Sequence, residues 1–286
     1  MPSSRQPRRG VKRATRATIV LALLLTVGGY IALRHSVPVL EPSSCAAAAS
    51  GQSIPLDVGQ AAIAATIAGV AQHHDLPPRA VTVAYATALQ ESKLTNPRSG
   101  DRDSVGVFQQ RPSEGWGPAR SIENPIYATT RFFGALTQVP GYQNMPVYQA
   151  AQAVQHSADG YAYNQYASVA TKMTRAFTGQ LPHGVWCWYN SPLGPRRLTA
   201  AGQALTRAFG PLRVGRIGDP QIGVRVAHPA AGWAVAAWLV SHAAPYGIRT
   251  VSYQGYEWLT KDGSSGWTRI KAGQRAKTPP AVVLFG

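Results

Sequence analysis

An uncharged apolar run near the N-terminus constrains this chain more than any other feature. Residues 17–33 read ATIVLALLLTVGGYIAL, which as a helix would span roughly 25 Å, near the lower limit for a bilayer core. Six basic residues precede the run and one follows it, an asymmetry that keeps the N-terminus in the cytoplasm. The sequence therefore predicts a basic cytoplasmic tail (1–16), a transmembrane helix (17–33) and a large extracytoplasmic part.

A cleaved signal peptide, which would make the protein secreted, is the alternative, because its basic start and apolar core would look alike. The run is longer than such a core usually is, and the Ala-rich residues 46–49 lie late for cleavage. We therefore favour an uncleaved single-pass anchor in the cell membrane. An oxidising compartment would permit a disulfide between Cys45 and Cys187, but the sequence leaves open whether they meet.

The charge balance of the 286 residues bears on possible partners. The formal net charge is +16, and seven positive charges lie in the first 34 residues, so the remainder still carries +9. A basic surface favours an anionic partner such as a cell wall or lipid headgroups, although a solvated surface without a partner is equally compatible. No RNP, zinc-finger or P-loop signature points to nucleic acid, which we do not expect as a partner.

Helical signals fill the middle of the chain. Asp57, followed three residues later by Gln60, is a capping-box pattern, and Pro78 suits the first turn of a second helix. Further helices are expected over 125–136, 146–155 and 166–176. These patterns predict a mainly α-helical domain over 57–180.

The flanking segments differ in composition. Residues 34–56, rich in Pro, Ser and Ala, are predicted to be a linker, and so are the Gly- and Pro-rich residues 181–223, apart from a short helix at 199–208. An apolar helix over 231–244 should then precede strands at 248–253, 256–259 and 281–285. We therefore expect a small C-terminal α/β domain over 224–286.

Glu91, near the end of the second predicted helix, is the candidate catalytic residue. The residues on its helical face, Ala88, Thr87 and Ala84, are small and uncharged, so this face could pack closely and exclude water. Desolvation raises the pKa of a carboxyl group, and a carboxyl group still protonated near neutral pH can protonate a glycosidic oxygen. The Thr87 hydroxyl would oppose this rise if it donated to the carboxylate, and the helix pattern alone also fits a solvated glutamate.

The residues that follow favour the catalytic interpretation. Glu91-Ser92, a polar loop over 96–104, the run GVFQ ending at Gln109, and then Pro112 occur in the order found in the soluble lytic transglycosylase and goose-type lysozyme superfamily, which this region resembles. The resemblance covers about a third of the chain. It implies a lysozyme-like fold for the helical domain, with Ser92 and Gln109 in a sugar-binding cleft beside Glu91 and with no metal or organic cofactor.

The resemblance also implies a reaction, cleavage of the glycan strand of peptidoglycan. The glutamate protonates the oxygen between N-acetylmuramic acid and N-acetylglucosamine, the substrate's own N-acetyl group assists, and the muramyl 6-hydroxyl closes a 1,6-anhydro ring. Asp101 and Asp103 could instead position a water for hydrolysis. The same two residues could also belong to an ordinary polar turn with an internal ion pair.

A third motif departs from the family pattern, which has an Ala-Tyr-Asn-Ala-Gly-like segment. Here residues 148–157 read YQAAQAVQHS, and the nearest Tyr-Asn pair begins at Tyr163. We expect Gln155 or Tyr163 to line the cleft. Trp116 and Tyr142 could stack on sugar rings, although core packing is the more common role of such side chains.

The remaining sequence leaves the function open in part. No His-Glu-x-x-His pairing or other metal motif occurs. Residues 232–238 (GWAVAAW), 247–248 and 253–258 resemble a domain of actinobacterial wall-associated proteins, which could bind a ligand or simply cap the helical domain. The leading hypothesis is a peptidoglycan lytic transglycosylase or muramidase; the alternative is a non-catalytic, membrane-anchored wall-binding protein or scaffold. Protein partners and oligomeric state stay undetermined.

Overall fold

Two compact units make up the chain in the computed structural model, Met1–Pro42 and Ser43–Gly286. The described residues are 22, 25–27, 29, 42–49, 51–157, 159–218, 221–271 and 282–286. Only five residues of the predicted transmembrane run are among them, all helical, and the rest of that prediction lies outside the described residues. Within the described part of the chain, no helix has the length and apolar character needed to cross a bilayer.

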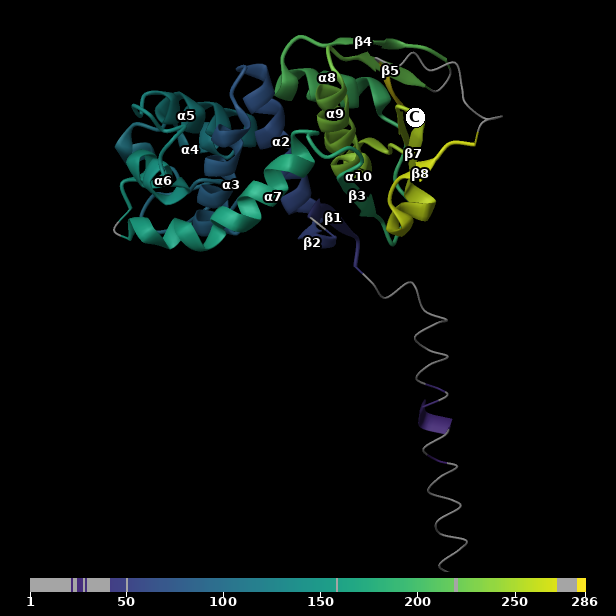
Figure 1. Cartoon of the computed structure of the whole chain (residues 1–286), viewed down its shortest axis with the longest axis horizontal. Coiled ribbons are helices and arrows are strands. Elements are labelled where there is room, and N and C mark those ends of the chain that lie inside the picture. The colour runs from purple at the N-terminus through teal and green to yellow at the C-terminus, as the bar shows by residue number, and fades with distance from the viewer. Residues whose placement is uncertain are drawn as a thin grey trace, which may run out of the picture. The chain divides into compact units, whose positions relative to one another are not determined.

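The unit Ser43–Gly286 has a mixed α/β fold (Figure 1). Its helices are α2 (Val58–His73), α3 (Pro78–Ser92), α4 (Ala119–Ile122), α5 (Pro125–Thr137), α6 (Val147–Gln155), α7 (Ala167–Phe177), α8 (Leu198–Phe209), α9 (Pro229–Ser241) and α10 (Ala243–Tyr246). Its 3-10 helices are η2 (Pro112–Glu114), η3 (Gly160–Tyr166) and η4 (Thr260–Ser265). The helices predicted over 125–136, 146–155, 166–176 and 199–208 are confirmed to within one residue at each end.

Helix α2 is the central element of this unit. The predicted capping box forms at its start, where Asp57 N donates to Gln60 Oε1 at 2.9 Å. Its residues from 63 to 71 are all buried, as expected of a helix that is apolar on every side. Helices α3, α5, α8 and α9 contact it, and in Figure 1 it lies between helices α3 to α6 and the green helices α8 and α9.

The strands of the described chain form two antiparallel sheets. The strands are β1 (Ser44–Ala49), β2 (Gln52–Asp57), β3 (Val185–Trp188), β4 (Arg213–Arg216), β5 (Ile222–Arg225), β6 (Thr250–Tyr253), β7 (Tyr256–Leu259), β8 (Thr268–Arg269) and β9 (Val282–Phe285). The small sheet has the order β2-β1-β3, and the larger has the order β4-β5-β9-β6-β7-β8. The strands predicted at 248–253, 256–259 and 281–285 are therefore confirmed as β6, β7 and β9.

The two segments predicted as linkers contain regular secondary structure in their described parts. Residues 44–49 and 52–56, within the predicted linker 34–56, are in β1 and β2. The segment 181–223 supplies β3, β4 and the start of β5 in addition to the expected helix α8. Pairing between distant strands overrides the Pro, Ser and Ala composition, because β1 gains hydrogen bonds on both edges, from β2 and from β3.

A disulfide joins the small sheet across this pairing. Cys45 of β1 lies directly opposite Cys187 of β3, and the two are bonded across 142 positions of sequence. Both cysteines are fully buried. Because disulfides persist in oxidising compartments, this bond indicates an extracytoplasmic domain.

Helix α9 connects the C-terminal strands to the rest of the unit. It is buried on all sides from Ala231 to Ser241 and contacts α2, β3, β6 and β9. Gly232 is required where α9 meets β6, because a Cβ there would lie 2.1 Å from the Tyr253 ring. Trp258 of β7 also donates to the Cys187 carbonyl at 2.9 Å. The predicted C-terminal region 224–286 therefore shares one core with the helical region.

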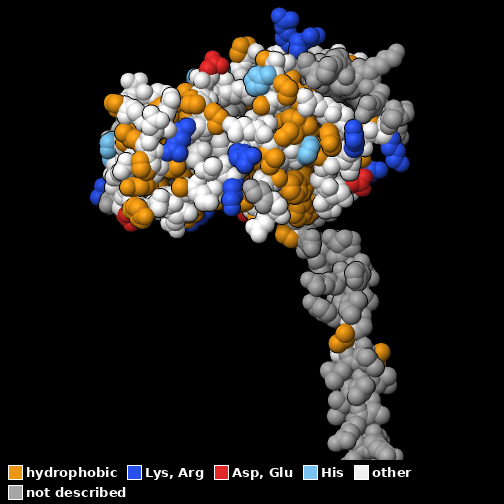
Figure 2. Space-filling model, viewed as in Figure 1, with side chains coloured by type: hydrophobic (Ala, Val, Ile, Leu, Met, Phe, Trp, Pro, Cys, Tyr) orange, Lys and Arg blue, Asp and Glu red, His pale blue; other side chains and the backbone are white. Residues whose placement is uncertain are grey.

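The surface reflects the composition of the chain. Figure 2 shows Lys and Arg side chains spread over one face of Ser43–Gly286, with few Asp and Glu among them. The described residues contain only four ion pairs, two of them made by Arg111. Most of the basic groups therefore face solvent without an acidic partner in the described chain.

Candidate active site

Glu91 lies in the last turn of α3, half-buried. Helix α3 begins at Pro78, whose fixed backbone suits a first turn, and Lys93 ends it in the left-handed conformation with a φ of 56°. Ala84, Thr87 and Ala88 are fully buried behind Glu91. The Thr87 hydroxyl donates to the Val83 carbonyl at 2.9 Å, so it does not donate to the Glu91 carboxyl group.

Tyr163 holds the Glu91 side chain. Its Oη donates to Glu91 Oε1 at 2.6 Å, from the middle of η3. Tyr163 is fully buried, and burial, reinforced by the Glu91 carboxylate, raises the pKa of its phenol well above the usual value. The hydroxyl therefore stays protonated and remains a hydrogen-bond donor to Glu91.

A tight turn from Val105 to Gln110 lies next to this pair. The backbone N–H of each end residue donates to the carbonyl of the other, at 3.0 and 3.1 Å. Gly106 is required in it, since its φ is +79° and a Cβ would lie 2.8 Å from the Ile122 carbonyl oxygen. Phe108 anchors the turn in the core by stacking on Phe132, with ring centroids 4.5 Å apart.

Two side chains predicted to line the cleft fix this turn from outside. Ser92 Oγ donates to the Val107 carbonyl at 2.8 Å, and Gln155 Nε2, at the end of α6, donates to the Phe108 carbonyl at 2.8 Å. The structure therefore brings Glu91, Ser92, Gln155 and Tyr163 to one place, although α3, α6 and η3 supply them separately. The sequence did not choose between Tyr163 and Gln155. In the structure, Tyr163 contacts Glu91 and Gln155 contacts the turn.

Gln109 lies in the same turn, but its amide is used internally. Its Nε2 donates to the Gly106 carbonyl at 3.1 Å, and its Oε1 accepts from Ser104 Oγ at 3.0 Å. Its backbone also has a positive φ of 47°. In this structure Gln109 stabilises the turn, and its amide would have to rotate to reach a sugar.

The two aspartates after Glu91 differ in environment. Asp101 is exposed, whereas Asp103 accepts from the Ser113 backbone N–H at 2.8 Å, from the Ser113 hydroxyl at 3.0 Å and from Arg111 Nε at 3.0 Å. These donors, the Ser113 N–H foremost, lower the pKa of the Asp103 carboxyl to about 2. Asp103 therefore braces the loop against η2, and its ion pair is with Arg111.

A cavity of about 740 Å³ lies beside Gln155. It lies between η2 and the ends of α5 and α6, and Trp116, Val139, Gln155 and His156 are among its lining residues. Gln155 belongs both to this cavity and to the support of the turn. Trp116 is half-buried and available to a ligand there, whereas Tyr142 is buried in the core.

Sequence reasoning missed two supports of the site. Gln60 of α2 closes the capping box and also donates from Nε2 to the Lys93 carbonyl at 2.8 Å, which ties α2 to the end of α3. Lys93 Nζ donates in turn to Tyr166 Oη at 2.6 Å. No local pattern reveals these contacts, because each joins residues at least 33 positions apart.

Comparisons with known proteins leave the site to be judged on its own geometry. No protein-family model matches the chain, and no curated protein matches it either. Across the described ranges, His, Cys, Asp and Glu side chains form no group of three that could hold a metal ion. Glu91, with the donor Tyr163 and the turn beside it, is the constellation best suited to acid–base chemistry.

Proposed function

We propose that the protein is a peptidoglycan lytic transglycosylase in which Glu91 is the general acid and base. The observation that carries this proposal is the 2.6 Å hydrogen bond from Tyr163 to Glu91, beside a turn supported by Ser92 and Gln155. Glu91, Ser92 and the turn also belong to the motif that carries the resemblance to the lytic transglycosylase superfamily, whereas Gln155 and Tyr163 lie where the third motif departs from the family pattern. The lysozyme-like fold of the helical region is part of the proposal.

Each oxygen of Glu91 has a separate task in this reaction. Oε1 accepts from Tyr163, and Oε2 has no hydrogen-bond partner among the described residues, so it can carry the transferable proton. Glu91 would protonate the glycosidic oxygen between N-acetylmuramic acid and N-acetylglucosamine while the substrate's N-acetyl group assists departure. The carboxylate then takes the proton of the muramyl 6-hydroxyl, which closes the 1,6-anhydro ring.

The state of the aspartates favours transglycosylation over hydrolysis. Hydrolysis with inversion needs a second carboxylate that activates water, about 6.5–9.5 Å from the acid. Asp103 is already bound by three donors, and its low pKa leaves it a weak base. Asp101 is the remaining candidate for water activation, and its replacement distinguishes the two outcomes.

Localisation follows from the same proposal. The apolar run 17–33 would anchor the protein by a single helix, with the basic tail in the cytoplasm and the enzyme facing the wall. The disulfide fits an oxidising exterior. The basic surface suits an anionic wall.

The test is digestion of purified sacculi by the full-length chain in a non-ionic detergent, with products identified by mass spectrometry. We expect 1,6-anhydro muropeptides from the wild type and their loss in Glu91→Gln. The control is Glu257→Gln, in β7 of the larger sheet. It makes the same chemical change away from the site and should leave activity intact.

Other products would change the assignment. Reducing ends in place of 1,6-anhydro ends would indicate hydrolysis, and their loss in Asp101→Asn would assign the water to Asp101. Sacculus binding without cleavage would contradict the enzyme proposal and indicate a wall-binding protein. Equal activity of Glu91→Gln and the wild type would show that Glu91 is not the catalytic acid.

A further inference from the structure

Among the described residues, β4 is an edge strand of the larger sheet. In the described part of the chain it pairs with β5 alone, and Arg213, Gly215 and Arg216 are exposed while Val214 is half-buried. An edge strand presents unpaired backbone N–H and C=O groups, which a further strand can bind. The neighbouring Ile217 is 55% exposed, an unusual fraction for a large apolar side chain in this protein.

Helix α8 forms a groove with this strand. A cavity of about 580 Å³ is lined by Thr199, Gly202 and Thr206 of α8 and, from β4 and the residue before it, by Leu212, Val214 and Arg216. Alternate residues of a strand share a face, so residues 212, 214 and 216 point toward α8 together. Val214 packs against Gly202, where a Cβ would lie 2.9 Å from Val214 Cγ1. A groove between an edge strand and a helix is a setting in which an extended peptide adds to a sheet.

The rim of the groove is basic. A second cavity, of about 360 Å³, shares Thr199, Arg216 and Ile222 with the first and is also lined by Arg196 and Arg197, from the segment before α8. Within the described residues, these arginines take part in no ion pair. The whole sequence from 160 to 256 has nine Lys and Arg and a single acidic residue, Asp219.

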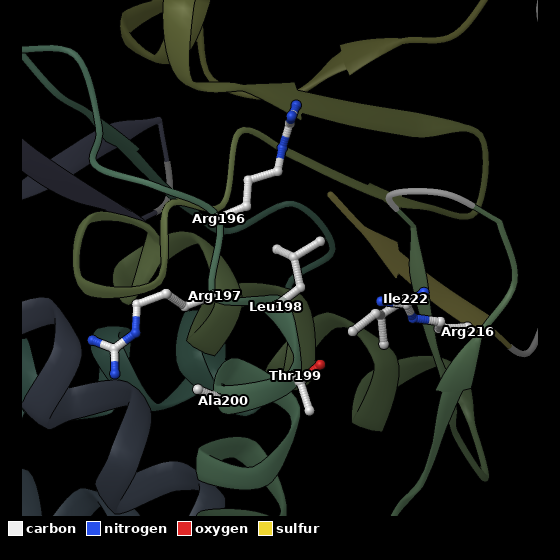
Figure 3. Close-up of a pocket in the computed structure, with 7 residues that line it drawn as sticks. All are labelled: Arg196, Arg197, Leu198, Thr199, Ala200, Arg216 and Ile222. Carbon is white, nitrogen blue, oxygen red and sulfur yellow. The ribbon is translucent and has the colours of Figure 1, made fainter.

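The arrangement of the three arginines indicates the shape of the ligand. In Figure 3, Arg197 lies at the left of the labelled residues and Arg216 at the right, and the Arg196 side chain points away from both. Because the guanidinium groups do not converge, one compact anion could not bind all of them. An extended ligand with several negative charges could meet them in succession.

Two other occupants fit less well. A second copy of the chain, pairing β4 with β4, would bring Arg213 and Arg216 of both copies close together, and such like-charge contacts are destabilising. A glycan commonly stacks on aromatic rings, yet the described lining residues of both cavities include no Phe, Tyr or Trp. An acidic peptide satisfies the backbone edge, the apolar floor and the basic rim together.

We propose that the groove between β4 and α8 docks an extended acidic segment of a partner protein, which adds as a strand to β4. The backbone of β4 would provide the hydrogen bonds. On the α8 face, side chains of the added strand would meet the apolar floor around Val214 and Ile222 and the rim arginines Arg196, Arg197 and Arg216. On the opposite face, carboxylates of the added strand would pair with Arg213. This site is separate from Glu91 and does not depend on glycan cleavage.

Fluorescence anisotropy with labelled peptides of about eight residues, near the usual strand length, tests the proposal on the full-length chain in a non-ionic detergent. A peptide alternating Glu and Val should bind, and one alternating Lys and Val should not. Arg213→Ser with Arg216→Ser should weaken binding at least about tenfold, whereas Lys261→Ser with Arg269→Ser, the same charge loss toward the opposite edge, should not. Equal weakening by both pairs would overturn a defined groove.

Backbone pairing needs its own readout. The Glu–Val peptide should slow hydrogen exchange of amides in 212–217, and an N-methylated version, which lacks backbone donors, should bind at least about tenfold more weakly. Equal binding of both versions, or no protection in 212–217, would overturn strand addition. A polyglutamate or polyphosphate competitor that displaces the peptide without protecting these amides identifies a simple polyanion site, which also contradicts the proposal.

Discussion

Tyr163 Oη and Glu91 Oε1 lie 2.6 Å apart, although their residues are separated by 72 positions in sequence. Burial places the Tyr163 ring in the core, and only its hydroxyl reaches the half-buried carboxyl group. Glu91 therefore keeps one orientation, because its donor cannot move without disrupting core packing.

Tyr163→Phe tests this contact at the scale of one atom. The ring still fills its place, so the thermal unfolding temperature should fall by no more than about 2–4 °C, the effect of about 1 kcal/mol. Release of 1,6-anhydro muropeptides should fall by about tenfold or more, because Glu91 loses its orienting donor. Tyr161→Phe, on the exposed side of the same η3 helix, should retain activity. Unchanged activity of Tyr163→Phe would mean that Tyr163 has no positioning role.

His242 gives a second prediction at this scale. It stacks on Trp238 with ring centroids 3.9 Å apart, and burial lowers its pKa from the ordinary 6.5 to about 4. Between pH 6.5 and pH 4 the unfolded chain binds a proton that the folded chain excludes. This contribution to the free energy of unfolding is therefore complete above pH 6.5 and declines as the pH falls toward 4.

The measurement is the thermal unfolding temperature against pH, for the wild type and His242→Phe, whose ring retains the stacking. The decline between pH 6.5 and 4 should be shallower in the variant. It should not vanish, because burial also lowers the pKa of His183. Parallel curves for the two proteins would contradict the assignment to His242.

At the scale of elements, the position of the turn from Val105 to Gln110 is set by neighbouring helices. Its own backbone bonds close it, but Ser92 of α3 and Gln155 of α6 fix where it lies. Asp103 braces the preceding loop through Ser113 and Arg111. Three separate elements thus set the geometry beside Glu91.

Gln155→Ala removes one of these supports. The Phe108 carbonyl loses its donor, which should lower the free energy of unfolding by about 1–2 kcal/mol. Hydrogen exchange of the Val105 and Gln110 amides should become faster, because the turn opens more easily. Gln149→Ala, exposed on the same helix, is the matched control. Unchanged exchange at both amides would show that α6 does not support the turn.

At the scale of the whole unit Ser43–Gly286, one core joins the parts that the sequence separates. Helices α2 and α9 pack together, each buried on all sides, and the disulfide joins β1 to β3 across the sequence between them. The helical region and the C-terminal sheet should therefore unfold together, in one cooperative transition.

Replacing both cysteines by alanine tests this organisation. The closed loop spans 142 positions, so the change should lower the free energy of unfolding by about 2–5 kcal/mol while calorimetry still records one transition. A reducing agent should destabilise the wild type and leave the double variant unaffected. Two separate transitions in the wild type would contradict the single core.

The sequence was sufficient for features governed by local chemistry. The capping box at Asp57, the start of α3 at Pro78 and the strands β6 and β7 depend on neighbouring residues, whose spacing already defines caps and alternation. Glu91 and the turn after it were located in the same way, because a short motif contains them.

Tertiary structure decided what depends on distant pairing. The segment 34–56 has the composition of a linker, yet β1 and β2 form in it because β3, far along the chain, completes their sheet and bonds Cys187 to Cys45. In the same way, η3 delivers Tyr163 to Glu91 and α6 delivers Gln155 to the turn. The local sequence determined which residues could act, and only burial in a shared core, which joins residues without regard to their separation, decided which of them meet.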